Sequence, residues 1–290
     1  MNAIGIDLGG TNVKGVRMNA AGVVLNQQTI PIVAGDWKAA VRTTFEALYP
    51  KSDPAGRVGL AAPGLPDEHN RKIMFMPGRL PGLEGFEWSE FLGQPVQVLN
   101  DAHAALLAEV NFGAAKNCRN VFMLTLGTGV GGGILINGDL YQGRLQRAGS
   151  LGDISLNSES DEIGFLQVPG TLEDAIGNES VPKRSGGRYQ STRELVAAYE
   201  QGDAFASEVW LKSVKKLAVA IASLINVLAP EKVILGGGIA QANELLFEPL
   251  NQYLYHYEWR PDGKSTPIVK AHFNEYAGAL GAASYAQQIS

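Results

Sequence analysis

The sequence predicts an α/β protein made of two similar halves that form a ligand cleft with two walls. Strand-like and helix-like segments alternate through the amino-terminal part of the chain, which is typical of an α/β fold. A short apolar strand that ends in a turn of glycine and threonine occurs at 4–12 and again at 121–133. Each half therefore offers a glycine turn to one ligand. We expect the halves to meet near 112–120, where small and polar residues interrupt the apolar pattern.

In the first half, runs of apolar and β-branched residues predict the strands, and apolar residues at helical spacing predict the helices. The predicted strands are 3–7, 13–18, 22–30, 57–61 and 96–98. The predicted helices are 36–48 and 101–112, and Asp101 lies near the start of the second one.

The second half begins with the strand 121–126, which leads into the glycine-rich run 127–133. A hairpin is predicted over 133–142, because Asn137-Gly138 suits a two-residue turn. The later elements are a loop over 154–171, a helix over 204–228, a strand over 233–235, a helix over 241–255, and a small, alanine-rich segment over 275–287 that can pack closely against another element.

Composition and charge narrow the classes of function. The chain has 290 residues, of which 45% are hydrophobic, so it can bury one large core or two ordinary ones. Its net charge of -5 argues against a nucleic-acid or membrane surface. Its one cysteine, Cys118, excludes an intramolecular disulfide and a cysteine-based zinc cluster. Because no stretch approaches the roughly 18 apolar residues of a membrane span and no signal-peptide pattern occurs, we expect a cytoplasmic protein.

The most informative stretch is 4–16, where a β-branched run carries Asp7 and then breaks into Gly9-Gly10 beside Thr11. Glycines without a Cβ let the backbone turn tightly and bring its N–H groups close to an anion. An acid at a strand end can hold Mg²⁺, directly or through water, as phosphoryl transfer requires. The alternative is a β-hairpin with a glycine turn and an incidental acid.

Two further glycine turns follow strands in the second half. Thr128 is the counterpart of Thr11, and the two threonine-containing turns can grip a polyphosphate from opposite sides. The turn Gly236–Gly238 could let a flat base lie against bare backbone. One glycine turn alone is a weak signal, but three at strand ends, with one acid before the first, indicate a nucleotide cleft.

A phosphoryl acceptor must also be activated, and Leu99-Asn100-Asp101-Ala102 places a carboxylate where an apolar strand meets a helix. Asp101 can be the base that orients and deprotonates a hydroxyl attacking the γ-phosphate. Asn100 can both donate and accept hydrogen bonds, which suits a polyol. The alternative is a helix cap, the commonest role of Asp or Asn at such a position.

These residues resemble those of the ROK family (repressor, open reading frame, kinase), a family of sugar kinases within the actin-like ATPase superfamily. The similarity spans nearly the whole chain. Its motifs are Asp7-Leu8-Gly9-Gly10-Thr11-Asn12, Ala62-Pro63-Gly64, Leu80-Pro81-Gly82, Leu99-Asn100-Asp101-Ala102, Leu126–Gly133, Ala148-Gly149, Leu172-Glu173, Gly236–Gly238, and Ala277-Gly278 with Gly281-Ala282.

The resemblance implies a two-lobed, actin-like (ribonuclease H-like) α/β fold with an interlobe cleft. One lobe would comprise 1–114 and 275–290, and the other, 115–274, would carry nucleotide and dimer surfaces. A homodimer is implied, with ATP and Mg²⁺ in the cleft, Asp7 organising the metal, and Asp101 as base toward a sugar hydroxyl. The implied nucleotide and phosphate contacts are Asp7, Gly9, Gly10, Thr11, Asn12, Thr128, Gly129, Gly236, Gly237 and Gly238.

The acceptor site departs from the family pattern. Kinases of the family typically show Ala-Gly-Glu-x-Gly-His, where the Glu grips sugar hydroxyls and the His contacts sugar and helps bind a structural zinc. Ser150 and Asp153 stand at those two positions here, and Arg79 replaces a sugar-contacting Asn. Because 154–171 contains no Cys and no His, the four ligands of a structural zinc are missing, and we predict none.

These departures affect the expected substrate. The implied acceptor contacts are Gly64, Arg79, Asn100, Asp101, Ser150, Asp153 and Glu173. Arg79 is either a solvated arginine at a loop edge or a partner for a carboxylate or phosphate on the acceptor. Glu173 either interacts with a helix dipole or contacts sugar, as the matching family position does. Our hypothesis is an acceptor other than plain glucose, such as an anionic or modified sugar.

Two other functions stay open. A sugar-responsive regulator would carry an amino-terminal helix-turn-helix, but the first strand is predicted to start at Asn2 or Ala3, so we expect no nucleic-acid partner. A degenerate kinase that binds sugar or nucleotide without catalysis is favoured by Ser150 and Asp153. The intact phosphate-binding turns and Asp101 oppose that alternative.

Overall fold

The structure is a computed structural model that describes residues 2–49, 56–76, 78, 80–159, 161 and 168–288. The chain divides into two compact units. Unit 1 comprises Met1–Cys118, Asp139–Gly149 and His272–Ser290, and unit 2 comprises Arg119–Gly138 and Ser150–Ala271. The segment Asp139–Gly149, which the sequence reading places in the second lobe, belongs to unit 1.

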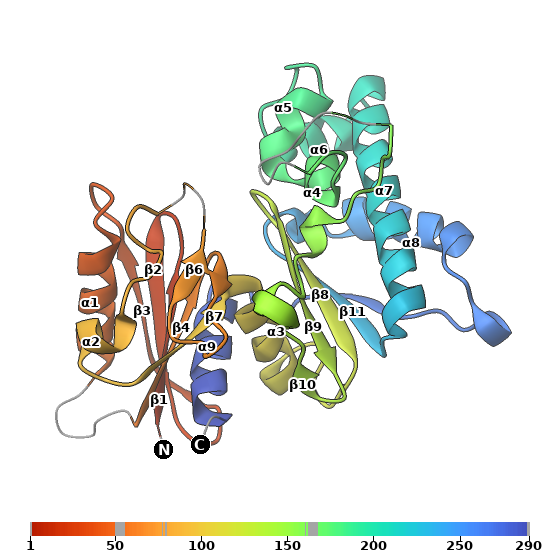
Figure 1. Ribbon diagram of the computed structural model, residues 1–290. Helices are drawn as coiled ribbons and strands as arrows, with labels where there is room; N and C mark the ends of the chain where they lie inside the picture. The colour runs from red at the N-terminus through yellow and green to blue at the C-terminus, as the bar shows by residue number, and fades with distance from the viewer. Residues whose placement is uncertain are drawn as a thin grey trace. The chain divides into compact units, whose positions relative to one another are not determined.

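Unit 1 is built on a five-stranded sheet with the order β3-β2-β1-β4-β7 (Figure 1). The strands are β1 (Ala3–Leu8), β2 (Asn12–Met18), β3 (Val24–Pro31), β4 (Arg57–Ala62) and β7 (Val96–Asn100). β1 pairs antiparallel with β2 and parallel with β4, and β7 continues the parallel part. The carboxyl ends of β1, β4 and β7 therefore lie at one edge of the sheet.

Helices cover both faces of this sheet (Figure 1). Side chains alternate between the two faces along each strand, and the apolar ones on both faces are buried against helices. Ile4 of β1 faces the core that includes α1 (Trp37–Leu48). Ala3, its neighbour, faces the opposite core, to which α3 (Asp101–Phe112) and α9 (Ala277–Gln288) contribute. The same alternation puts Asp7 on the α9 face.

The last helix, α9, packs backbone to backbone against the sheet. A Cβ at Gly5 would lie 1.8 Å from Ala279 O, and a Cβ at Gly59 would lie 1.9 Å from Ala282 O. No side chain fits at either strand position, since real Cβ atoms never approach so closely. This confirms the close packing predicted for the alanine-rich segment.

A buried carboxylate in unit 1 joins the segment that follows α3 to the segment that precedes α9. Glu109 of α3 has no exposed surface, and its Oε2 accepts a hydrogen bond from Ala114 N at 2.8 Å. Its Oε1 accepts from Phe273 N at 2.6 Å. One side chain thus fixes both the turn after α3 and the segment that leads into α9.

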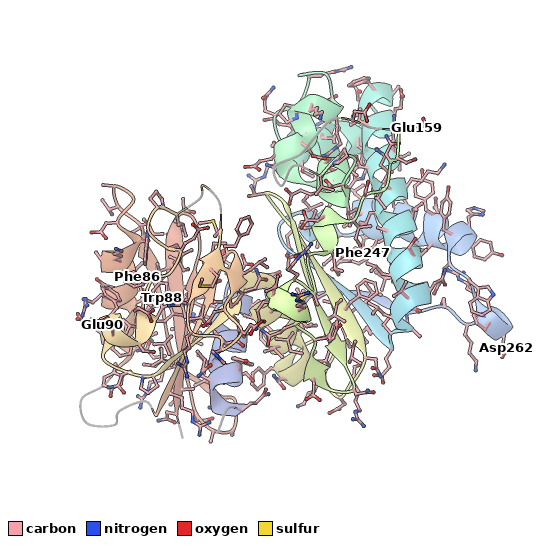
Figure 2. All side chains as sticks on the ribbon, in the orientation of Figure 1. Phe86, Trp88, Glu90, Glu159, Phe247 and Asp262 are labelled. Carbon is pink, nitrogen blue, oxygen red and sulfur yellow. The ribbon has the colours of Figure 1, made fainter. Side chains whose placement is uncertain are left out.

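Smaller elements complete unit 1. They are β5 (Leu65–Pro66), β6 (Ile73–Phe75), α2 (Trp88–Leu92), β10 (Asp139–Leu140) and a short 3-10 helix, η1 (Arg144–Gln146). Figure 2 shows Phe86 and Trp88 together beside the sheet, with ring centroids 4.9 Å apart. Trp37 of α1 completes this aromatic cluster at 5.4 Å from Trp88.

The second sheet repeats the strand order of the first as β10-β9-β8-β11-β12, and its strands other than β10 belong to unit 2. Its central strand β8 (Val121–Leu126) pairs antiparallel with β9 (Val130–Ile136) and parallel with β11 (Lys232–Gly236), and β12 (Ile268–Lys270) continues the parallel part. The chain turns at Asn137-Gly138 after β9, and both residues have positive φ. The two sheets confirm the predicted α/β fold of two similar halves. The predicted hairpin over 133–142 is wrong at its start, because β9 begins at Val130 and the glycines that follow lie inside it.

The helices of unit 2 surround a core centred on α7 (Ala204–Leu228), which begins where Asp203 accepts a hydrogen bond from Ala206 N at 2.7 Å. The others are α4 (Leu172–Ile176), α5 (Val181–Arg184), α6 (Thr192–Glu200), α8 (Glu244–Tyr257), and the 3-10 helices η2 (Leu151–Asp153), η3 (Asn178–Ser180), η4 (Ile239–Ala242) and η5 (Pro261–Gly263). In the described ranges, none of the helices combines the length and apolar character needed to cross a bilayer.

Candidate functional site

Three of the predicted site segments meet at one edge of the unit 1 sheet. Asp7 near the end of β1 is in register with Ala61 of β4, and Ala62 is in register with Asn100 of β7. Asn100 Nδ2 donates to Gly64 O at 3.0 Å, so the turn after β4 is tied to the end of β7. Gly64 has a φ of 101°, a conformation that favours glycine.

The two polar residues at the start of α3 have different tasks. Asn100 Oδ1 caps the helix, accepting from Ala102 N at 2.9 Å and from His103 N at 3.3 Å. Asp101 is the first helical residue; it is exposed, and its Oδ1 accepts from Ala102 N at 2.8 Å. Asn100 is therefore the residue that caps α3. Asp101, which follows it directly, is left with an exposed carboxylate at the edge of the sheet.

Asp7 carries a strongly perturbed carboxyl group. Burial, and then the negative charge of Asp101, raise the pKa of Asp7 to about 7, while Lys14 opposes the shift. The two carboxylates are therefore close enough to repel each other. A cation at this edge would relieve that repulsion and favour ionised Asp7.

The turn after β1 is closed by a hydrogen bond from Gly9 N to Asn12 O at 3.1 Å. Neither Gly9 nor Gly10 has a positive φ, so the backbone conformation does not require glycine. Gly10 has open space where a Cβ would be, and Thr11 beside it is exposed. The bare backbone here is accessible to a ligand, which is the property that a phosphate site needs.

The second and third glycine turns adjoin each other in unit 2. Gly127 N donates to Gly129 O at 2.9 Å and closes the β8–β9 turn. Gly237 follows β11 with a φ of 85°, and a Cβ there would lie 2.3 Å from Leu126 O at the end of β8. Gly238, the next residue, has open space around it.

These two turns border an open groove with a volume of about 1210 Å³. Its lining residues are Gly127, Thr128, Asn178, Ser191, Thr192, Arg193, Glu194, Val196, Ala197, Glu200, Gly238, Ile239, Gln241, Ala242, Asn243, Glu244 and Leu245. The part formed by α6 is missing from the sequence prediction. A signal for it exists, because Ser191 and Glu194 have capping-box spacing, and Glu194 N donates to Ser191 Oγ at 3.2 Å.

The predicted acceptor residues are distributed over both units. Gly64, Asn100 and Asp101 belong to unit 1, whereas Ser150, Asp153 and Glu173 belong to unit 2. Ser150 is exposed and precedes η2, which ends at Asp153. Arg79 lies outside the described residues, as does most of the stretch 160–167 in the predicted loop.

Two residues of unit 1 anchor the segment that leads to Ser150. His103 Nε2 lies 2.8 Å from Ala148 O, and burial lowers the pKa of His103, so the neutral ring donates this bond. Its Nδ1 is buried with no hydrogen-bond partner among the described residues. Gln146 Nε2 donates to Asp67 O at 3.2 Å. The position of Ala148 is therefore set from the same helix that carries Asp101.

The donors available to a metal ion are few. Within the described ranges, no three His, Cys, Asp or Glu side chains gather as a metal-binding group. Asp7 and Asp101 nevertheless offer carboxylate oxygens, the ligands that Mg²⁺ prefers, and this ion usually takes its remaining ligands from water and substrate phosphates. The residues present fit a magnesium site of that kind.

Comparison with known proteins agrees with this geometry. The sequence profile of the ROK family matches residues 3–289. A glucokinase from Thermotoga maritima is 31% identical over 308 residues, covering 98% of this chain and 96% of that protein. The crystal structure of a ROK hexokinase from Thermus thermophilus has a TM-score of 0.82 at 28% identity, covering 99% of this chain and 98% of that one. A ROK family glucokinase from Streptomyces griseus, in complex with glucose and AMPPNP, has a TM-score of 0.79 at 25% identity, with 100% of both chains covered.

The family profile spans nearly the whole chain, and the structural similarity extends over both units. The protein belongs to the ROK family.

Proposed function

We propose that this protein is an ATP-dependent carbohydrate kinase that transfers the γ-phosphoryl group to a hydroxyl of a sugar or sugar derivative. The observation that carries the proposal is the exposed carboxylate of Asp101, held at the sheet edge and electrostatically coupled to Asp7. The groove of unit 2, with its glycine turns, suits a nucleotide. The similarity to a glucokinase solved with glucose and AMPPNP supports the same function.

In this mechanism Asp101 is the general base. It accepts the proton of the acceptor hydroxyl while that oxygen attacks the γ-phosphorus in line with the leaving oxygen of ADP. The new O–P bond forms as the bond to ADP breaks, so the products are a sugar phosphate, ADP and a proton on Asp101. Asn100 keeps the base in position by capping α3 and holding Gly64.

The phosphate groups are assigned to two turns. The backbone of Gly9-Gly10 with Thr11 and Asn12 offers N–H groups and a hydroxyl on one side, and Thr128 with Gly129 offers them on the other. Gly236–Gly238 is assigned to the base of the nucleotide. Mg²⁺, when bound, neutralises phosphate charge, and Asp7 would hold it directly or through water.

The acceptor is assigned to Gly64, Arg79, Asn100, Ser150, Asp153 and Glu173. Because Ser150 and Asp153 replace the sugar-gripping Glu and His of the family, and Arg79 replaces an Asn, we propose an anionic or modified sugar. The test is a panel of hexoses, amino sugars and sugar acids with ATP and Mg²⁺. Efficient turnover of neutral hexoses with inert acidic sugars would overturn this assignment of substrate. Nucleotide binding without turnover of any sugar would instead favour a degenerate binding protein.

The substitution Asp101→Asn tests the base. It should abolish phosphoryl transfer, by about 10³-fold or more, and leave affinity for AMPPNP largely intact. Asp36→Asn is a matched control, since Asp36 also accepts a backbone hydrogen bond at a helix start, from Ala39 N at 3.0 Å. Retained turnover in Asp101→Asn would remove the assigned base. We further propose a homodimer, which light scattering at working protein concentration would test.

A further inference from the structure

The short segment Glu173–Glu179 holds the turn between β8 and β9 at three points. Asn178 N donates to Gly127 O at 2.9 Å, and Glu179 N donates to Thr128 O at 3.0 Å. On the other side of the turn, Val130 N donates to Glu173 Oε2 at 2.8 Å. Both carbonyls at the start of the turn and the first amide after it are therefore bonded to one segment.

The approach of Glu173 to the turn is close. A Cβ at Gly129 would lie 2.2 Å from Glu173 Oε2. A side chain at this position would therefore have to displace the Glu173 carboxylate, whatever ligand binds. Because Glu173 Oε2 accepts the hydrogen bond of Val130 N, the side chain of Glu173 contributes directly to the conformation of the turn.

Arg184 fastens this segment from the far side. Its Nη1 donates to Gly177 O at 2.8 Å and to Asp174 O at 3.4 Å, and also to Ser180 Oγ. Burial lowers the pKa of Arg184 to about 10, so the guanidinium stays charged at neutral pH. It satisfies carbonyls at the end of α4 that have no partner within the helix.

The same segment also reaches the wall of the groove. Asn178 Oδ1 accepts a hydrogen bond from Thr192 N, the first residue of α6, at 2.8 Å. Asn178, Thr128 and Thr192 all line the groove. Displacement of Asn178 would therefore move the turn and the α6 wall together.

We propose that Glu173–Glu179, fastened by Arg184, is a brace that presets the Gly127–Gly129 turn for the phosphates of the nucleotide, with Glu173 and Arg184 as positioning residues. The inference rests on the proposed function, in which this turn binds phosphate. It gives Glu173 a task on the nucleotide side, through Oε2, in addition to its assigned contact with the acceptor.

The experiment compares Glu173→Gln with Glu173→Ala, using AMPPNP with Mg²⁺ as the probe in calorimetric titrations without sugar. Gln keeps an oxygen that can accept from Val130 N, so its nucleotide affinity should stay within about twofold of the wild type. Ala removes the acceptor and should weaken AMPPNP binding about tenfold. If both variants bind AMPPNP like the wild type, or if both lose it equally, the brace is wrong. If the wild type does not bind AMPPNP at all, the proposed function fails first.

Arg184→Met provides the second test, with Arg188→Met as its control. Arg188 lies four residues after Arg184, beyond the end of α5, and its exposed side chain pairs with Asp203. We expect Arg184→Met to weaken AMPPNP binding about tenfold, and Arg188→Met to change it less than twofold. Thermal unfolding of each variant is measured in parallel. A lower Tm for Arg184→Met with unchanged AMPPNP affinity would contradict the brace, because a purely structural arginine behaves in that way. Should Arg184→Met fail to fold, Arg184→Lys keeps the charge but loses the fork and is measured in its place.

Discussion

The carboxylate of Asp7 occupies the space that a side chain at Gly278 would need. A Cβ at Gly278 in α9 would lie 2.6 Å from both Cγ and Oδ2 of Asp7. The last helix therefore forms one wall around the acid at the end of β1. Glycine at this position lets the helix pass close to the acid without displacing it.

Gly278→Ala should therefore disturb Asp7. We expect a loss of about 1–3 kcal/mol in the free energy of unfolding, as overpacking of a dense interior usually costs, together with a lower kcat. Urea denaturation of the single and double variants checks the cause. In an Asp7→Ala background the same glycine substitution should cost less than half as much. An equal cost in both backgrounds would show that the strain lies elsewhere.

Asp7→Asn should stabilise the protein at alkaline pH while it abolishes activity. The pKa of Asp7 rises from 3.8 to about 7 on folding, so the unfolded chain ionises more readily. The stability that this group provides is complete below pH 3.8 and declines as the pH rises toward 7. Asparagine removes that decline, and we expect a gain on the order of 4 kcal/mol at pH 8 and less than about 1 kcal/mol at pH 4. Urea unfolding at both pH values, without Mg²⁺, measures it; no gain at pH 8 would contradict the raised pKa.

His103→Gln should make the protein less sensitive to acid. Burial lowers the pKa of His103 below 6.5, so the stability from its neutral form is complete above pH 6.5 and is lost as the pH falls through the lower, folded value. Glutamine can still donate to Ala148 O but does not titrate. Between pH 7.5 and 5, the unfolding free energy of the variant should fall less steeply than that of the wild type. The difference between the two slopes should be at most about 1.4 kcal/mol per pH unit, the slope that one proton produces. Parallel pH profiles for both proteins would exclude this role.

Glu109→Ala should destabilise unit 1 strongly, because two partly buried backbone N–H groups would lose their acceptor. We expect a loss of about 3 kcal/mol in the free energy of unfolding. The exposed Glu46 on α1 is a matched control, and its replacement by Ala should change stability by less than about 0.5 kcal/mol. Denaturant unfolding of the two variants gives the comparison. Equal stabilities would mean that water replaces the lost carboxylate without cost.

The sequence predicts the parts of the fold where periodicity and capping agree. The helix 204–228 is found with the predicted bounds, since its apolar stripe is long and Asp203 caps it. The start of β9 is not found, because its glycines carry no strand signal and are placed in the sheet only by pairing with β8. The helix α6 is likewise missing from the prediction, whereas α4 is found where Glu173 is expected to open a helix.

The candidate site shows the same division. Asp7 and Asp101 are predictable, because an acid at a strand end or helix start is visible in one short window. Glu109 and the contact of Glu173 with Val130 are not, since each joins residues far apart in the sequence. The sequence also does not decide which residue caps α3, because Asn100 and Asp101 are equally able to do so. The structure shows that Asn100 is the cap.

The seating of α9 against β1 and β4 has a consequence for biosynthesis. The amino-terminal sheet is made first, yet the surface that Gly5 and Gly59 offer waits for a helix made after the whole of unit 2. During translation the α9 face of the nascent sheet therefore stays exposed and prone to aggregation, while unit 2 can already fold. Chaperones that bind nascent chains would act on the first strands. Unit 2 would complete its folding first, and unit 1, although it is begun first, would complete its folding last.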